Sequence, residues 1–287
     1  MEPLDCVETE MLGKRTCVAI PDTVLEEHDS LRDKTQKLGL IARYCSIFGV
    51  DLIRIFHDPR GRGESAFMKR VLEYLETPQY LRRRLFPLSD ELRFAGLLPP
   101  LRTPSHKPKV PVDKLQVGEH REGFVLADGA TADVGLDSSA SLAHKASPNR
   151  RVTIRVTSTS PLTGVVVDRK EVGPYWGYAV DVCGQGELLS DPAFPMRIAT
   201  SRSGDPLLRS LPSLRASLGG AKGVMAIFGS PSRGLPQIFG KDIRGKVSFL
   251  VNLFPEQNVA TVRSEEAILA ALYLLQILMA EGAPKPR

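Results

Sequence analysis

Short apolar runs and helical patterns alternate along the N-terminal third of the chain. The apolar runs at residues 17–21 and 51–58 predict strands, whereas apolar residues at helical spacing predict helices over 31–50 and 65–77. Ser65 is a preferred residue for capping the start of the second helix, and a proline closes that helix. The order strand, helix, strand, helix predicts a parallel sheet with right-handed crossovers.

The pattern changes between two proline-rich segments, 99–111 and 192–195. Residues 100–192 contain many turn formers and short β-branched runs such as "RVTIRVTS" and "TGVVVDR", and they show no convincing helix. These features predict a small β-barrel of residues 100–192 that is inserted into an α/β domain formed by residues 1–99 and 193–287.

Strand and helix patterns return after residue 196. The segments "RIATSRSG", "GVMAIFGS" and "SFLVNLF" predict three more strands, and a final helix follows them. Its start is predicted near residue 264, because Ser264 can cap a helix and Glu265 and Glu266 suit the positive end of the helix dipole.

This last helix is predicted to be apolar on nearly all sides. Twelve of the thirteen residues from 267 to 279 are apolar, and Gln276 is the exception. Because one face of the helix must cover the sheet, another apolar face is left for a second subunit. The pattern therefore predicts a homodimer.

Charge is distributed unevenly over the 287 residues. The net charge is +5, and residues 196–287 alone carry +6, from 12 Lys and Arg minus 6 Asp and Glu. This charge favours a polyanionic partner over a membrane, although a solvated basic surface explains it equally well. The longest apolar run, 267–275, is too short to cross a bilayer, which takes about 20 residues.

Cysteines and histidines favour neither a metal site nor a disulfide. The four cysteines show no CxxC spacing, and the five histidines show no paired ligand spacing. Nothing near the N-terminus resembles a secretory segment. We therefore expect free thiols, Cys6 included, in a reducing cytoplasm, and no bound metal.

Small and polar residues follow the three predicted C-terminal strands, at 199–204, 228–235 and 252–261. No GxGxxG motif follows either N-terminal strand, and no GxxxxGK[ST] motif is present, which disfavours dinucleotide and P-loop sites. Ligands of open α/β sheets bind at the carboxyl ends of the strands, so the three segments together predict a binding site. Within 228–235, Gly229 and Gly234 would let the backbone come close to a ligand, and Ser230 and Ser232 could hydrogen-bond to it. For this segment alone, a tight turn with a proline is the alternative.

These segments also carry a family resemblance. The order and spacing of "IARYCSIFGVDLIRIF", "LRRRLFPLSDELRFAGLLPPL", "TSRSG", "FGSPSRGL" and "TVRSEEAILAAL" resemble the SPOUT class of S-adenosylmethionine-dependent RNA methyltransferases, over nearly the whole chain. Within that class the chain is similar to an archaeal and eukaryotic branch thought to methylate N3 of uridine in ribosomal RNA. The resemblance implies an α/β fold with a C-terminal trefoil knot and an inserted barrel of the oligonucleotide-binding (OB) type.

The same resemblance implies that the three polar segments hold S-adenosylmethionine. The implied cofactor-binding residues are Thr200, Arg202, Phe228, Gly229, Ser230, Gly234, Leu235, Asn252, Leu253, Phe254, Pro255, Gln257, Val259, Ala260 and Thr261. The chain departs from the family at 255–258, which reads PEQN in place of Pro-Gly-Gln-Gly. Asn258 tolerates positive φ, whereas Glu256 introduces a carboxylate either in solvent or near the cofactor's sulfonium.

Methylation of a uridine N3 requires loss of the imide proton, and the sequence shows no obvious general base. The resemblance puts Arg202 near the cofactor or the target phosphate, where it could stabilise a developing imidate oxygen; a surface pair with Asp205 is the alternative. Asn252 could orient the methionine moiety or the base, or be a buried turn residue. Arg263 and Glu265 recur in the family motif, and we expect structural roles for them.

Two groups of residues are candidates for RNA binding. Arg82, Arg83 and Arg84 could track phosphates, or form an ordinary solvated face. Tyr175 and Trp176 could stack on bases, although core packing explains Trp176 at least as well. The altered loop leaves a second function open, that of a non-catalytic RNA-binding or ribosome-assembly protein that keeps the fold.

Overall fold

The computed structural model describes residues 14–280, and this part of the chain forms two compact units. One unit, called the barrel unit below, consists of residues 76–89 and 101–177. The other, called the sheet unit, contains residues 14–75, 90–100 and 178–280.

Six parallel strands form the centre of the sheet unit, in the order β11-β9-β10-β1-β2-β8. They are β1 (Arg15–Pro21), β2 (Leu52–Phe56), β8 (Ala179–Cys183), β9 (Met196–Pro206), β10 (Gly223–Ile227) and β11 (Phe249–Asn252). Nearly all residues of β1, β2 and β10 are buried, as is typical of strands that are covered on both faces. The predicted parallel sheet is confirmed.

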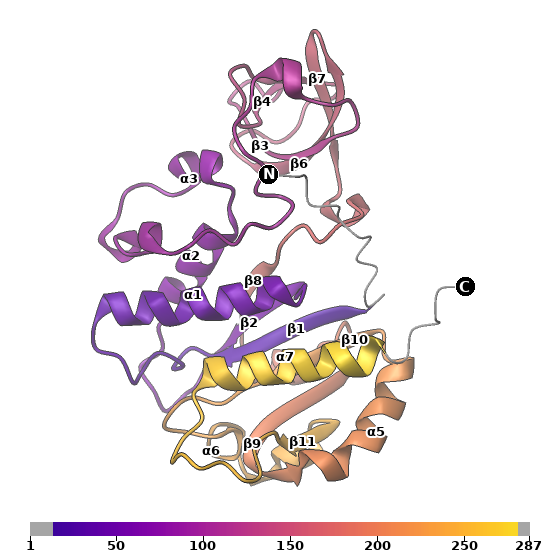
Figure 1. Cartoon of the computed structure of the whole chain (residues 1–287). Coiled ribbons are helices and arrows are strands. Elements are labelled where there is room, and N and C mark those ends of the chain that lie inside the picture. Colours follow the sequence, from indigo (N-terminus) through magenta and orange to yellow (C-terminus); the bar gives the residue numbers. More distant parts are fainter. Residues whose placement is uncertain (1–13, 281–287) are drawn as a thin grey trace. The chain divides into compact units, whose positions relative to one another are not determined.

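Helices cover both faces of this sheet. On one face α1 (Leu31–Ile47) and α7 (Ser264–Ala280) lie side by side, and α5 (Leu207–Gly220) also packs against α7 (Figure 1). On the other face α4 (Gln185–Ser190) and α6 (Leu235–Phe239) bury apolar side chains against the strands. The remaining elements of the unit are α2 (Ser65–Glu76), η1 (Asp90–Leu92), η2 (Ala95–Leu97) and η5 (Lys241–Gly245).

The start of α7 lies where the sequence predicts it, but its cap differs. Glu265 and Glu266 occupy the first turn, as expected. Ser264 is the first helical residue, and its hydroxyl donates to the carbonyl of Gly229 at 3.3 Å instead of capping the helix. The side chain of Glu266 accepts the backbone N–H of Arg263 at 2.9 Å. Ser264 thereby ties the helix start to the segment after β10.

A bulge in β9 moves residues 200–204 out of the sheet. Ala199 pairs with Leu250, whereas the next pair joins Asp205 to Val251. Gly204 permits this path, because a Cβ at this position would lie 2.6 Å from the carbonyl carbon of Val251. The segment that the sequence places after a strand therefore projects from within β9.

The barrel unit contains a closed five-stranded barrel in the order β3-β4-β5-β7-β6, which confirms the predicted small barrel. Its elements are α3 (Gln79–Leu85), η3 (Val112–Lys114), β3 (His120–Val125), β4 (Thr131–Asp133), β5 (Ala140–Leu142), β6 (Arg151–Thr159), β7 (Leu162–Val167) and η4 (Arg169–Glu171). The interior is apolar, with Val134, Ile154 and Val156 among its buried residues. Beside it the buried carboxylate of Glu122 accepts hydrogen bonds from Thr153, at 2.8 Å, and from the indole N–H of Trp176.

The limits of this unit differ from those that the sequence predicts. The β-branched run at 179–183 reads like one more barrel strand, but it forms β8 and pairs in parallel with β2 at the edge of the sheet. Residues 178–192 therefore belong to the sheet unit, and α3 belongs to the barrel unit. Short β-branched runs look alike in both units, because a strand's partner is not encoded in its own sequence.

Cys17, Cys45 and Cys183 are buried free thiols, and burial raises the pKa of Cys183 to about 11. Cys6 lies outside the described residues. Between residues 14 and 280, no helix is long and apolar enough to cross a membrane. The same residues contain no group of three His, Cys, Asp or Glu side chains that could hold a metal ion.

Candidate functional site

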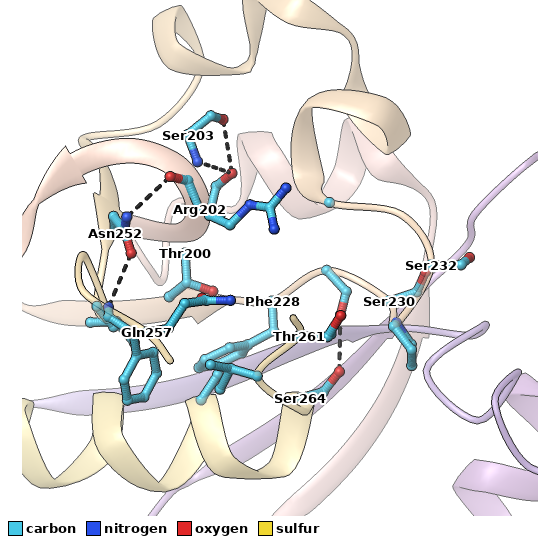
Figure 2. A pocket seen from close by; sticks show the side chains of 18 of the residues that line it. Thr200, Arg202, Ser203, Phe228, Ser230, Ser232, Asn252, Gln257, Thr261 and Ser264 are labelled. Atoms are coloured by element: carbon cyan, nitrogen blue, oxygen red, sulfur yellow. Dashed lines mark hydrogen bonds between the residues drawn. The ribbon is translucent and has the colours of Figure 1, made fainter. Parts of the chain in front are cut away.

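Three segments at the carboxyl edge of the sheet surround a cavity of about 430 Å³. They are the bulge of β9 (200–204), the loop after β10 (228–234) and the loop after β11 (253–263), and Figure 2 shows their side chains turned toward one another. The lining residues are Thr200, Ser201, Arg202, Ser203, Phe228, Gly229, Ser230, Pro231, Ser232, Gly234, Gln237, Asn252, Leu253, Phe254, Gln257, Ala260, Thr261, Val262, Ser264 and Ala267. The volume lies in the range of roughly 300–1,000 Å³ that is typical of small-molecule sites.

Asn252 fixes the bulge of β9 against the loop after β11. Its Nδ2 donates to the carbonyl of Arg202 at 3.1 Å, and its Oδ1 accepts the backbone N–H of Phe254 at 3.0 Å (Figure 2). Arg202 completes the connection, since its Nη1 lies 3.4 Å from the carbonyl of Ala260. The two segments thus form one continuous wall.

Gln257 shapes the loop after β11 from within. Its Nε2 donates to the carbonyls of Val259, at 2.8 Å, and Ala260, at 3.2 Å. These bonds hold the loop in a compact turn and occupy carbonyls that would otherwise need water. Glu256, the unusual residue of this loop, is exposed and does not line the cavity.

The loop after β10 forms the opposite wall and folds tightly on itself. The N–H of Ser230 donates to the carbonyl of Arg233 at 2.9 Å. A Cβ at position 229 would lie 2.9 Å from that same carbonyl oxygen and 3.1 Å from the Cα of Gly234, so the turn requires glycine at 229. Ser264 then links the turn to α7.

Charged side chains hold this loop from outside the cavity, and we call this group the clasp: Glu26, Asp58 and Arg233. Nε of Arg233 lies 2.9 Å from Asp58, and its Nη2 lies 2.9 Å from Glu26. The other oxygen of Glu26 accepts hydrogen bonds from Ser230, at 2.7 Å, and from the hydroxyl of Ser232.

The clasp is ionised at neutral pH. Burial raises the pKa of Glu26, but hydrogen bonds from Ser232 and Ser230 and the charge of Arg233 outweigh burial and leave this pKa below its ordinary value. The pKa of Asp58 is likewise lowered: burial opposes the shift, and the backbone N–H of Arg60 and the side chain of Arg233 cause it. The hydrogen bond to Asp58 raises the pKa of Arg233.

The chemistry of the lining is polar but almost uncharged. Arg202 is the one ionisable side chain among the lining residues, which otherwise supply hydroxyl and amide groups, backbone groups and the rings of Phe228 and Phe254. Such a surface can hold a heterocycle between apolar groups while pairing its polar edges. Asp205, the alternative partner of Arg202, pairs with Arg244 at 2.6 Å.

The structure gathers most of the residues that the sequence indicates for a cofactor. All of them line this cavity except Leu235, Pro255 and Val259. Leu235 is buried in the core at the start of α6, Pro255 is exposed, and the side chain of Val259 is 59% exposed. For Val259 the implied contact runs through its backbone, whose carbonyl accepts from Gln257.

Ser232, which the sequence offers as a hydrogen-bonding residue for a ligand, also lines the cavity. Sequence reasoning missed seven lining residues: Ser201, Ser203, Pro231, Gln237, Val262, Ser264 and Ala267. Three of them, Ser201, Ser203 and Pro231, lie inside the segments that the sequence indicates, so the segments predict the site better than the individual residues do. Gln237 and Ala267 come from helices, and only the fold brings these helices to the cavity.

Residues 263 and 265 have structural contacts. The carboxylate of Glu265 is buried beside the equally buried ammonium of Lys37 on α1, at 3.1 Å, and Glu27 also pairs with that lysine. Arg263 contributes its backbone N–H to the start of α7. These contacts agree with the structural roles that we expect for both residues.

The candidate RNA-binding residues all lie in the barrel unit. Nε of Arg82 donates to the carbonyl of Thr77 at 2.9 Å, Arg83 is exposed, and Arg84 pairs with Asp133 at 2.7 Å. Tyr175 is half-buried. Trp176 is only 5% exposed and is bonded to Glu122, so its ring is core packing, the alternative that its sequence context left open.

Comparison with known proteins places the chain among RNA methyltransferases. A family model described as "Putative RNA methyltransferase" matches residues 15–275. The chain is 35% identical over 285 residues to an uncharacterized protein of Halobacterium salinarum, covering 89% of this chain and 96% of that protein. It is 32% identical to the 28S rRNA (uridine-N(3))-methyltransferases of Mus musculus, over 94% of this chain and 78% of the relative, and of Homo sapiens, over 90% and 77%.

Proposed function

The chain belongs to this RNA methyltransferase family, and we propose that it transfers the methyl group of S-adenosylmethionine to N3 of a uridine in ribosomal RNA. One observation carries the proposal: three segments from separate strands converge on a cavity whose size and nearly uncharged polar lining suit a nucleoside. The substrate follows from the relatives of mouse and human, whose names specify uridine N3.

The loop after β11 would hold the adenine. Phe254 and Leu253 offer apolar contact, and the backbone of Ala260 and Thr261 offers polar groups to the purine edges. An unpaired polar group buried in such a site costs about 1–3 kcal/mol, so a loop already rigid from the bonds of Gln257 recognises these edges with little reorganisation. Bound there, S-adenosylmethionine would supply an activated methyl group on its sulfonium.

Arg202 would act on the reacting base. Its guanidinium is exposed at the cavity, and the bond between Asn252 and its own carbonyl fixes its backbone. A fixed cation at this place can stabilise the negative charge that develops on the uracil oxygens as N3 loses its proton. We assign Asn252 a positioning role, because both ends of its amide already bond to the two walls.

We further propose that the C-terminal segment is threaded as in the SPOUT class. The hydrogen bonds from Asn252 to Arg202 and from Ser264 to Gly229 support this arrangement, since they join the last segment of the chain to both earlier loops. The first turn of α7, which contributes Ser264 and Ala267 to the lining, would then form one side of the cavity.

The proposed enzyme is a cytoplasmic homodimer that pairs through α7. Leu269, Tyr273 and Ile277 recur at every fourth position of this helix, and they are 38%, 58% and 40% exposed. Three exposed apolar side chains on one helical stripe favour a protein partner over water.

A non-catalytic RNA-binding protein remains the rival function, and the PEQN sequence of the loop motivates it. Isothermal titration calorimetry with S-adenosylmethionine separates the two functions. We expect saturable binding at one site per chain, because Glu256 is exposed and does not line the cavity. No detectable heat at millimolar cofactor would favour the rival.

A further inference from the structure

Two arginines of the loop after β2 carry unpaired charge. We call residues 57–64 the β2–α2 loop; Arg60 and Arg62 are both exposed on it. Neither guanidinium takes part in an ion pair or hydrogen bond with any of residues 14–280. The acidic groups near the loop have other partners, since Glu64 pairs with Lys34 at 2.7 Å and Asp58 pairs with Arg233 at 2.9 Å.

Buried carboxylates fix the backbone of this loop. Asp22 is 3% exposed, and it accepts from Nδ1 of His57 at 2.8 Å and from the backbone N–H of Asp58 at 2.9 Å. Asp58 is fully buried and accepts the backbone N–H of Arg60 at 3.1 Å and the hydroxyl of Thr23 at 3.1 Å. Burying two carboxylates costs free energy unless they are hydrogen-bonded, and here their hydrogen bonds hold the backbone of the loop in one conformation.

The two glycines of the loop allow its backbone to lie close against the protein. A Cβ at Gly61 would lie 2.2 Å from Cγ2 of Thr23, and a Cβ at Gly63 would lie 2.1 Å from Oδ2 of Asp22. The backbone is therefore pressed against the protein at 61 and 63. Arg60 and Arg62, on either side of Gly61, are exposed to solvent on this rigid support.

The clasp joins this surface to the cavity wall. Arg233 binds Asp58 of the β2–α2 loop and Glu26, and Glu26 in turn binds Ser230 and Ser232 of the wall. Ser230 and Ser232 lie beside the indigo ribbon of the N-terminal region in Figure 2. The β2–α2 loop is thus held next to the cavity by a continuous series of bonds.

We propose that the β2–α2 loop is a docking surface for the backbone of the RNA substrate, with Arg60 and Arg62 as its phosphate ligands. Guanidinium groups bind phosphate oxygens through paired hydrogen bonds, and a fixed pair of them beside a catalytic cavity sets the register of a flexible strand. This inference rests on the proposed function, because it concerns the substrate of the same cavity.

The test compares Arg60→Gln/Arg62→Gln with a matched variant, Arg15→Gln/Lys222→Gln. Arg15 and Lys222 are exposed and lie at the start of β1 and just before β10, at the amino edge of the same sheet. Each double variant removes two positive charges. Binding of a short fluorescein-labelled single-stranded RNA of mixed sequence is followed by fluorescence anisotropy over a series of salt concentrations.

For the loop variant we expect affinity to fall on the order of tenfold and the slope of log K against log salt to become about 1.4 shallower, which is about 0.7 for each lost phosphate contact. The matched variant should keep the affinity and slope of the original protein. Calorimetry should give both variants unchanged affinity for S-adenosylmethionine, since neither pair lines the cavity.

An unchanged affinity and slope in the loop variant would overturn the proposal, and so would equal losses in the two variants. Loss of affinity for a poly-aspartate peptide without loss for RNA would also overturn it, in favour of an acidic protein partner. A protein that binds no S-adenosylmethionine at all would contradict the proposed function instead. A failure of the docking surface can therefore be distinguished from a failure of the proposed function.

Discussion

At the scale of single residues, Gly229 leaves no room for a side chain in the wall of the cavity. We predict that Gly229→Val abolishes binding of S-adenosylmethionine, because a Cβ here meets the carbonyl of Arg233 and pushes the loop after β10 into the cavity. Calorimetry measures the loss. Gly184→Val is the matched control, since Gly184 has φ of −77° and no atom within 4 Å of its Cβ position. Wild-type affinity in the Gly229 variant would remove this residue from the site.

Substitution of Arg202 tests whether this residue contributes to the methylation rate or to cofactor binding. We predict that Arg202→Ala lowers the methylation rate by on the order of a hundredfold, the effect of losing one fixed group that stabilises transition-state charge. Affinity for S-adenosylmethionine should change much less, because within residues 14–280 the guanidinium bonds only to the carbonyl of Ala260, at the long distance of 3.4 Å, so its loss disturbs the cavity wall little. Single-turnover rates with labelled cofactor give the comparison. An unchanged rate would demote Arg202 to a surface residue.

Residues of the site were predictable where a small or polar segment follows an apolar strand in the sequence. Gly229 and Asn252 stand in polar segments that follow apolar strands, and a strand end is readable from the sequence. Gln237 was not predictable, because its place at the cavity depends on where α6 starts and how the fold positions it. Asp22 and Asp58 went unnoticed for the same reason: their partners lie far away in sequence.

At the scale of elements, the clasp determines how firmly the loop after β10 is held. We predict that Glu26→Ala weakens binding of S-adenosylmethionine about tenfold while changing the free energy of unfolding by less than about 1 kcal/mol, since ion pairs near the surface contribute little stability. Calorimetry and urea denaturation measure the two quantities. Asp29→Ala, which removes an exposed carboxylate from the same segment, is the control and should change neither.

The ionised carboxylates of the clasp make its stabilising effect depend on pH. Because the pKa values of Glu26 and Asp58 are both lowered in the folded protein, the stabilisation by the clasp is complete above the ordinary carboxylate pKa of about 4 and is lost as the pH falls below it. Cofactor affinity should therefore keep its clasp contribution from pH 8 down to about 5. If Glu26→Ala changed the shape of the affinity profile within this range, the clasp would not be ionised as described.

Most elements of the sheet unit were predictable from periodicity, and one strand was not. α1 and α2 have apolar residues at helical spacing, and β1 and β2 are apolar runs. The run at 179–183 has the β-branched residues of a barrel strand, yet it completes the sheet beside β2. Propensity identifies a strand, whereas tertiary pairing chooses its sheet.

At the scale of the whole molecule, the α7 stripe predicts the oligomeric state. We expect a dimer by multi-angle light scattering at micromolar concentration, and we expect Tyr273→Glu to shift the protein to a monomer by placing a charge in an apolar interface. Val117→Glu, at a 66% exposed apolar position in the barrel unit, is the matched control and should remain dimeric. A wild-type monomer would contradict the dimer.

The two-unit organisation was predictable because composition changes sharply between the proline-rich segments. The closed barrel and the parallel sheet follow from short β-branched runs on one side and alternating strands and helices on the other. The bulge of β9 that opens the cavity was beyond sequence reasoning. It depends on Gly204 passing close to the backbone of β11, a contact between segments that no local pattern records.

We propose above that methyl transfer to uridine N3 takes place in the cavity between the three loops. Its most direct test is mass spectrometry of the nucleosides obtained after ribosomal RNA lacking the modification is incubated with this protein and methyl-labelled S-adenosylmethionine. We predict that the wild-type protein produces labelled 3-methyluridine and that Gly229→Val produces none. Label in a different nucleoside, or no label from a protein that binds both cofactor and RNA, would contradict it.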